Sequence, residues 1–222
     1  MDAKTKEAAL ANNARQFRKG IVPDEVRECY DNYAGRYDKD LNPESYLGPK
    51  MAAEALTSYV ERSGWSKGKI RVLDVGAGTG FVAIQLANRG FKRMDALDPS
   101  EGMLEKAKTR GVYENFIQEF LTPDPTPGIA NDTYDAVVSS GGMGEGHIPC
   151  GALREMVRVV KPGGLVVIAM REEYLRCTSG YENLEPTMAA MENEELWERL
   201  ERSVLPGYCY HKDGLVYVFR KK

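Results

Sequence analysis

The sequence has few of the features that mark secreted, membrane and metal-binding proteins. Its 222 residues include only four cysteines and two histidines. The cysteines form no Cys-x-x-Cys pair, so they predict reduced thiols and neither a disulfide framework nor a metal site. No apolar run reaches the roughly 18 residues that a membrane-spanning helix needs. The N-terminus has no apolar signal core and carries Asp2 and Glu7, which predicts a cytoplasmic location and leaves a nuclear one open.

Composition and charge indicate an ordinary globular domain. Apolar residues make up 42% of the chain and charged residues 28%, which is typical of globular proteins. The formal net charge of −3 predicts no electrostatic attraction to nucleic acid. We expect one domain over residues 1–222, with a mobile or loosely docked arm at 1–20, a helical cap at 23–64 and an α/β core at 70–222.

A glycine turn follows the first apolar segment of the expected core. Residues 70–75 read Ile-Arg-Val-Leu-Asp-Val, which predicts a buried parallel strand. Glycines then stand at alternate positions, and apolar residues resume at helical spacing from Val82. A strand, a glycine turn and the start of a helix make a ligand site of the nucleotide-binding type, because backbone amides there can face a bound group.

The spacing of the glycines separates two kinds of cofactor. A dinucleotide fingerprint, Gly-x-Gly-x-x-Gly/Ala, needs a small residue where this chain has Phe81. The turn Asp-x-Gly-x-Gly-x-Gly instead resembles the first motif of class I, seven-stranded S-adenosylmethionine methyltransferases. The resemblance implies that Asp74 meets the ammonium group of the cofactor. It also implies that the turn meets the cofactor's carboxylate, through Gly76, Ala77, Gly78 and Thr79.

An acidic residue ends the next expected strand, Met94-Asp95-Ala96-Leu97-Asp98. A carboxylate at Asp98 can accept hydrogen bonds from both ribose hydroxyls of a nucleoside. The alternative is a turn that starts a helix, with Ser100 as the N-cap. Pro99 belongs to the same expected site. Met103, early in the following helix, suits either an adenine face or the core.

Three tyrosines share one face of a helix that begins near Pro23. Tyr30, Tyr33 and Tyr37 stand at positions i, i+3 and i+7, and plain packing is an open alternative for the first two. Residues 30–38 resemble the Tyr-Asp-x-x-Ala-x-x-Tyr-Asp helix that caps the cofactor in many small-molecule methyltransferases. Tyr37 is the expected ligand contact, because its ring face suits a sulfonium through cation–π attraction.

Two later strands are expected to complete the site. The strand at 113–120 ends in Gln118, Glu119 and Phe120, which the resemblance places near the adenine edge. The strand at 134–140 should meet the methionine part of the cofactor, because ligands bind where the strand order reverses. The contacts expected there are Ser139, Ser140 and Gly141.

The glycine-rich loop after the strand at 134–140 supplies the one catalytic candidate. His147 lies near the expected mouth of the pocket, and an imidazole suits a general base. A hydrogen-bonding role without catalysis is the alternative, and Glu145 is a weaker candidate. Many such enzymes need no base, because the sulfonium is already a strong electrophile.

The C-terminal third predicts the rest of the sheet. We expect a helix at 149–160, a strand at 165–170, an irregular segment at 171–187 and a helix at 191–203 whose Leu196 and Leu200 are four apart. Strands at 205–211 and 215–220 are joined by Lys-Asp-Gly, which predicts a hairpin. The expected fold is α/β: a doubly wound, mostly parallel seven-stranded Rossmann-like methyltransferase sheet, with a C-terminal antiparallel hairpin and an N-terminal helical cap.

Three hypotheses for function follow. The first is an S-adenosylmethionine-dependent methyltransferase that acts on a small molecule and releases S-adenosylhomocysteine. The second is a protein methyltransferase or a non-catalytic binder of the cofactor with a protein partner. The third is an NAD-dependent oxidoreductase, which Phe81 and the terminal hairpin disfavour. Within the family, the Tyr-Leu-Gly-Pro segment at 46–49 and the Gly-His-Ile-Pro loop at 146–149 resemble the Williams–Beuren region methyltransferase-like group.

Overall fold

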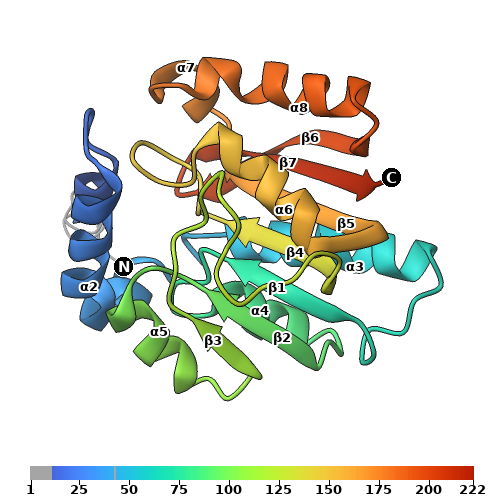
Figure 1. Ribbon diagram of the computed structural model, residues 1–222. Coiled ribbons are helices and arrows are strands. Elements are labelled where there is room, and N and C mark those ends of the chain that lie inside the picture. The colour runs from blue at the N-terminus through green and yellow to red at the C-terminus, as the bar shows by residue number, and fades with distance from the viewer. Residues whose placement is uncertain (1–11, 43) are drawn as a thin grey trace.

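A computed structural model describes residues 12–42 and 44–222, so most of the expected arm at 1–20 lies outside the described residues. Within them, seven strands form one sheet in the order β3-β2-β1-β4-β5-β7-β6 (Figure 1). Neighbours pair in parallel except where β7 pairs with β5 and β6. The expected seven-stranded sheet with an antiparallel C-terminal hairpin is therefore confirmed. Its strands are β1 (Arg71–Val75), β2 (Arg93–Leu97), β3 (Asn115–Ile117), β4 (Tyr134–Ser140), β5 (Val160–Arg171), β6 (Trp197–Cys209) and β7 (Lys212–Lys221).

Helices cover both faces of the sheet. Side chains alternate between the faces along a strand, so Val72 of β1 belongs to the buried cluster that includes α3 (Gly48–Arg62) and α4 (Phe81–Ala87). Leu73 belongs to the cluster on the other face, which includes α6 (Leu153–Val159) and α8 (Leu184–Asn193). Figure 1 shows α6 in front of the sheet and α3 and α4 behind it. The remaining elements are η1 (Arg15–Phe17), α2 (Pro23–Asp40), α5 (Glu101–Lys108), η2 (Cys150–Ala152), α7 (Tyr174–Cys177) and η3 (Tyr181–Asn183).

Helix α2 is held across the carboxyl ends of the strands by α5. Ser100 caps α5 by accepting a hydrogen bond from the Met103 amide at 3.1 Å, which is the alternative that the sequence left open for this segment. The Ser100 hydroxyl also donates to Asp31 of α2 at 2.6 Å. A Cβ on Gly102 would lie 3.0 Å from the Asp31 carbonyl oxygen, so a glycine lets the two helices approach closely.

The expected helix at 191–203 is wrong. Helix α8 ends at Asn193, Glu195 adopts a left-handed φ of 59°, and residues 197–209 form strand β6. The four-residue spacing of Leu196 and Leu200 mimicked a helical stripe, but packing decided the structure. Trp197 is fully buried, stacks on Phe219 at 3.8 Å and donates its indole N–H to the Met188 carbonyl.

The hairpin also turns at a different place from the expected Lys-Asp-Gly. Cys209 pairs with Lys212, so the turn is formed by Tyr210 and His211, and Tyr210 adopts a φ of 54°. Gly214 lies inside β7, where a Cβ would meet the Tyr208 side chain at 2.9 Å. Gly214 is needed for close packing against Tyr208 and not for the turn, so the Asp-Gly pattern predicted the hairpin turn at the wrong residues.

Smaller differences concern boundaries. Strand β3 has three residues instead of the expected eight, and the segment at 171–187 holds α7, η3 and the start of α8. Of the expected helix at 149–160, residues 150–152 are η2 and α6 follows. In the described chain, no helix is both long and apolar enough to cross a bilayer.

Candidate cofactor site

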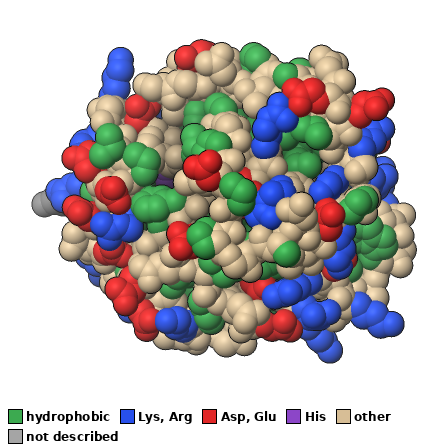
Figure 2. All heavy atoms as spheres, in the orientation of Figure 1, with side chains coloured by type: hydrophobic (Ala, Val, Ile, Leu, Met, Phe, Trp, Pro, Cys, Tyr) green, Lys and Arg blue, Asp and Glu red, His purple; other side chains and the backbone are tan. Residues whose placement is uncertain are grey.

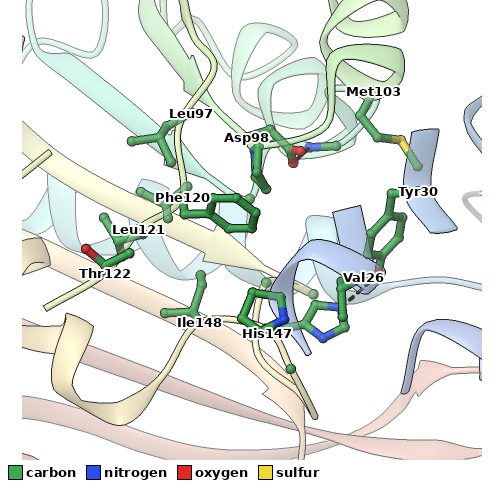
Figure 3. Close-up of a pocket in the computed structure, with 18 of the residues that line it drawn as sticks. Val26, Tyr30, Leu97, Asp98, Met103, Phe120, Leu121, Thr122, His147 and Ile148 are labelled. Carbon is green, nitrogen blue, oxygen red and sulfur yellow. Dashed lines mark hydrogen bonds between the residues drawn. The ribbon is translucent and has the colours of Figure 1, made fainter. Parts of the chain in front are cut away.

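A cavity of about 370 Å³ lies at the carboxyl ends of β1, β2 and β4, where the strand order reverses. Its walls come from α2, the glycine turn, the end of β2, residues 120–123, residues 140–142 and residues 146–149 (Figure 3). In Figure 3, Phe120 and His147 point toward the same space, with Leu97 and Asp98 on one side and Tyr30 on the other. A switch point of this kind is where open α/β sheets bind ligands.

Ten of the sixteen residues expected at the site line this cavity. These are Tyr37, Gly76, Gly78, Asp98, Pro99, Met103, Phe120, Ser140, Gly141 and His147. The others lie outside its walls: Asp74, Ala77, Thr79, Gln118, Glu119 and Ser139. Gln118 is exposed to solvent beyond the end of β3, so the short strand turns it away from the cavity, and Phe120 occupies the wall instead.

Hydrogen bonds within the protein already occupy three backbone amides of the glycine turn. The amides of Gly76 and Ala77 donate to the Leu97 carbonyl at 2.8 and 3.2 Å, and the Gly78 amide donates to Asp98 at 2.8 Å. All three glycines of the turn have positive φ, with 67° at Gly76. The amides therefore tie β1 to β2, and the expected open set of donors for a carboxylate is not present at these positions.

Asp98 is a buried acidic side chain of the cavity wall. One carboxylate oxygen accepts from Gly78 and the other from Ser100, at 2.8 and 2.9 Å. Burial raises the pKa of Asp98 to about 6, although the two amides lower it. Asp98 is thus mostly ionised at pH 7, and each oxygen keeps one lone pair for a hydroxyl group.

Asp74 lies beneath the cavity and not in its wall. It is 1% exposed, and one of its oxygens accepts from the Tyr113 hydroxyl at 2.6 Å. The other oxygen has no hydrogen-bond partner among the described residues. Burial raises the pKa of Asp74 to about 7, while the bond from Tyr113 lowers it. Contact between Asp74 and the cofactor's ammonium group stays a prediction.

Thr79 holds α2 over the turn. Its hydroxyl donates to Asp38 of α2 at 2.6 Å. Arg110 joins the same cluster, with an ion pair to Asp38 and a hydrogen bond to the Thr79 carbonyl at 3.1 Å. Thr79 therefore positions the helix that brings Tyr30 and Tyr37 to the cavity. Tyr33 points elsewhere and donates to the buried Asp40 at 3.0 Å.

His147 and Tyr30 form a hydrogen-bonded pair in the cavity wall (dashed line in Figure 3). Nδ1 of His147 lies 2.7 Å from the Glu145 carbonyl oxygen, which can only accept, so Nδ1 carries the proton. Nε2 then has a free lone pair and accepts from the Tyr30 hydroxyl at 3.0 Å. Burial lowers the pKa of His147 to about 4, while the Glu145 carbonyl raises it, so the imidazole is neutral at pH 7.

Glu145 does not line the cavity; its side chain links separate backbone segments by hydrogen bonds. Its two carboxylate oxygens accept from the amides of Gly20 and Ser179, at 3.1 and 2.8 Å. These bonds tie the N-terminal segment to the loop that carries His147. Phe17, on the same segment, stacks on the His147 ring with a centroid distance of 4.5 Å.

Sequence reasoning missed several residues of the wall, most of them apolar. Leu97, Leu121, Thr122 and Ile148 all line the cavity. Leu97 is the last residue of β2 and directly precedes Asp98, and its place at a strand end was a usable signal. The contributions of Leu121 and Thr122 depend on the path of the proline-containing loop after β3, which has no local sequence signature.

The residues of the wall fit S-adenosylmethionine. An apolar surface that includes Leu97, Met103 and Phe120 suits an adenine ring, and Asp98 beside it suits a ribose. A Cβ on Gly78 would meet nothing within 4 Å, so this wall is open to a closely bound group. Charged side chains of both signs are interspersed over much of the face in Figure 2, and Lys and Arg side chains gather toward its right and lower right.

The fold and this site define a Rossmann-like transferase that binds a nucleoside cofactor. A family model described as "Methyltransferase domain" matches residues 72–164. Human methyltransferase-like protein 27 is 35% identical over 181 residues, which cover 81% of this chain and 71% of that protein. The demethylmenaquinone methyltransferase of Renibacterium salmoninarum is 39% identical over 147 residues, and the match covers 66% of this chain but only 59% of that protein.

Solved structures share the fold. A structure of the Haloferax volcanii Trm112 methyltransferase activator with a methyltransferase superimposes with a TM-score of 0.61 at 19% identity, covering 86% of this chain and 97% of that one. Magnesium protoporphyrin IX methyltransferase from Synechocystis, with bound S-adenosylhomocysteine, gives 0.57 at 13% identity, covering 79% and 84%. This chain belongs to the class I S-adenosylmethionine-dependent methyltransferases, and S-adenosylmethionine is its cofactor.

Proposed function

We propose that this chain transfers a methyl group from S-adenosylmethionine to a small-molecule acceptor held inside the cavity under α2. The observation that carries the proposal is the Tyr30–His147 pair, because it places a proton acceptor in the wall of the cofactor cavity. The walls come from several separate segments, including α2, which favours a small acceptor over a protein side chain. The names of the demethylmenaquinone methyltransferases also specify a small-molecule acceptor.

The cofactor would be held by the apolar wall and Asp98. When bound, S-adenosylmethionine supplies an electrophilic methyl group and a positive charge that is lost on transfer. The protein's part is to align the acceptor, exclude water and receive a proton where the acceptor carries one.

Tyr30 and His147 form a path for that proton. As the Tyr30 hydroxyl gives its proton to Nε2 of His147, its oxygen can take one from the acceptor. The Glu145 carbonyl, 2.7 Å from Nδ1, stabilises the imidazolium that results. Burial disfavours this cation in the resting protein, but the charge lost with the methyl group offsets the charge gained by His147.

The test uses radiolabelled S-adenosylmethionine and a metabolite extract that is separated by size after the reaction. We expect label in the small-molecule fraction. His147→Gln should slow transfer by about 10²- to 10⁴-fold, and S-adenosylhomocysteine affinity should stay close to wild type. The matched control is His211→Gln, because His211 is exposed in the β6–β7 turn.

Two results would contradict the proposal. Label confined to macromolecules would point to a protein acceptor. Equal transfer rates for His147→Gln and His211→Gln would remove the imidazole from the reaction.

A further inference from the structure

A second, smaller cavity lies beside the cofactor cavity. It has a volume of about 20 Å³, enough for about one water molecule. Tyr30, Tyr37 and Gly141 line both cavities. The smaller cavity therefore adjoins the end of β4, where the methionine part of the cofactor and the acceptor are expected to meet.

Arg171 brings a positive charge to this small cavity. It is the last residue of β5, and its side chain is 16% exposed. The guanidinium lies over the rings of Phe17 and Tyr174, at 5.4 and 5.6 Å from their centroids. Stacking of this kind fixes the plane of the guanidinium and leaves its N–H groups directed outward from the edge.

Among the described residues, this guanidinium has a thiol as its hydrogen-bond acceptor and one long ion pair. Nη2 of Arg171 lies 3.7 Å from the Cys209 sulfur, a weak acceptor. Burial raises the pKa of the Cys209 thiol, so at neutral pH it carries no charge. Glu173 is 3.9 Å from Arg171, beyond hydrogen-bond distance, and the same carboxylate lies 2.7 Å from Lys212.

Tyr174 adds a hydroxyl donor beside Arg171. It lines the small cavity and is 6% exposed. Its hydroxyl is buried and has no hydrogen-bond partner among the described residues. A buried hydroxyl in this state is costly unless a ligand or water satisfies it.

We propose that Arg171 and Tyr174 form a subsite for a carboxylate group. A carboxylate accepts two hydrogen bonds from a guanidinium edge and a third from a phenol. Two sources share this chemistry: the methionine end of the cofactor, whose carboxylate finds the amides of Gly76 and Ala77 already bonded, and a carboxylic-acid acceptor. The inference rests on the proposed function, because it assumes that the large cavity holds the cofactor.

The first arm of the test measures the affinities of S-adenosylhomocysteine and 5′-methylthioadenosine by calorimetry. The two share the adenosine part, and only the first has a carboxylate. If the carboxylate is the cofactor's, Arg171→Gln should lower the affinity for S-adenosylhomocysteine about ten- to a hundredfold and leave the affinity for methylthioadenosine unchanged. Tyr174→Phe should also lower the affinity for S-adenosylhomocysteine alone, by a smaller factor.

The second arm titrates 4-hydroxybenzoate and 4-hydroxybenzamide into protein saturated with S-adenosylhomocysteine. If the carboxylate is the acceptor's, wild type should prefer the acid, and Arg171→Gln should abolish that preference. Arg171→Lys keeps the positive charge but lacks the guanidinium edge, so it should retain part of the preference for the acid. The matched control is Arg176→Gln, an exposed arginine paired with Glu172.

The outcomes separate this assignment from the proposed function. The subsite is wrong if Arg171→Gln and Tyr174→Phe, both with wild-type melting temperatures, change neither comparison, or if wild type shows no preference for a carboxylate in either arm. Failure of wild type to bind both S-adenosylhomocysteine and methylthioadenosine would overturn the proposed function as well.

Discussion

Replacement of Asp98 by asparagine tests the ribose contact. The carboxylate has about four acceptor positions, of which the Gly78 and Ser100 amides use two. Asparagine has one carbonyl oxygen and an NH₂ group, which cannot accept from the remaining amide or from a hydroxyl. The loss of one charge-assisted hydrogen bond is worth about 1.5–3 kcal/mol, so the Kd for S-adenosylhomocysteine should rise about 10- to 150-fold.

The assay is calorimetric titration at pH 7.5, with Asp24→Asn as the matched control. Asp24 also lines the cavity, but its side chain is 78% exposed, and its replacement should change the Kd by no more than about twofold. An Asp98→Asn protein that melts like wild type and binds S-adenosylhomocysteine with an unchanged Kd would refute the ribose contact.

The same contact predicts a pH dependence. The pKa of Asp98 is raised to about 6 in the folded, cofactor-free protein. Protonation below that pH removes a charged acceptor, so wild-type affinity for S-adenosylhomocysteine should fall as the pH drops below about 6. In Asp98→Asn this part of the pH dependence should be absent, and equal pH profiles for the two proteins would contradict the argument.

Three further predictions follow from burial. The imidazole of His147, observed alone by NMR in a His211→Ala background, should not titrate between about pH 5.5 and 8, because burial lowers its pKa to about 4; a midpoint near 6.5 would contradict this. The raised pKa of Asp74, about 7, means that its contribution to stability is lost as the pH rises through 7. Asp74→Asn should therefore raise the free energy of unfolding of the cofactor-free protein by up to about 4 kcal/mol at pH 8, and this gain should be absent below about pH 4. Denaturant unfolding curves of the two proteins that coincide at pH 8 would contradict this prediction. Trp197→Phe loses the hydrogen bond to Met188 and leaves a void beside Phe219, so it should lower the free energy of unfolding by about 2–4 kcal/mol. The control Val204→Ala, on the exposed part of β6, should lower it by about 0.5 kcal/mol or less. Equal losses for the two variants would contradict the burial of Trp197.

The cofactor end of the site was predictable because its signals are local. The glycine turn, Asp98 and the Ser100 cap each depend on a few consecutive residues. The structure has the turn after β1, Asp98 in the cavity wall and Ser100 capping α5, although the amides of the turn bond within the protein. Tyr37 also lines the cavity, as the resemblance implied, whereas helical spacing alone did not separate it from Tyr33, which bonds to Asp40 instead.

The rest of the site depends on contacts between distant segments. Arg171 and Tyr174 meet Phe17 across more than 150 positions of the chain, and no local pattern marks that contact. The wrong helix at 191–203 has the same origin. Leu196 and Leu200 suggested a helical face, but the strand formed because Trp197 packs on Phe219 of β7.

The most direct test of the account is a crystal structure of the protein with S-adenosylhomocysteine. We predict that the ligand fills the cavity under α2, with its ribose on Asp98, its adenine against Phe120 and its sulfur facing the Tyr30–His147 pair. A ligand bound elsewhere, or one whose homocysteine end points away from that pair, would contradict the proposed site of methyl transfer.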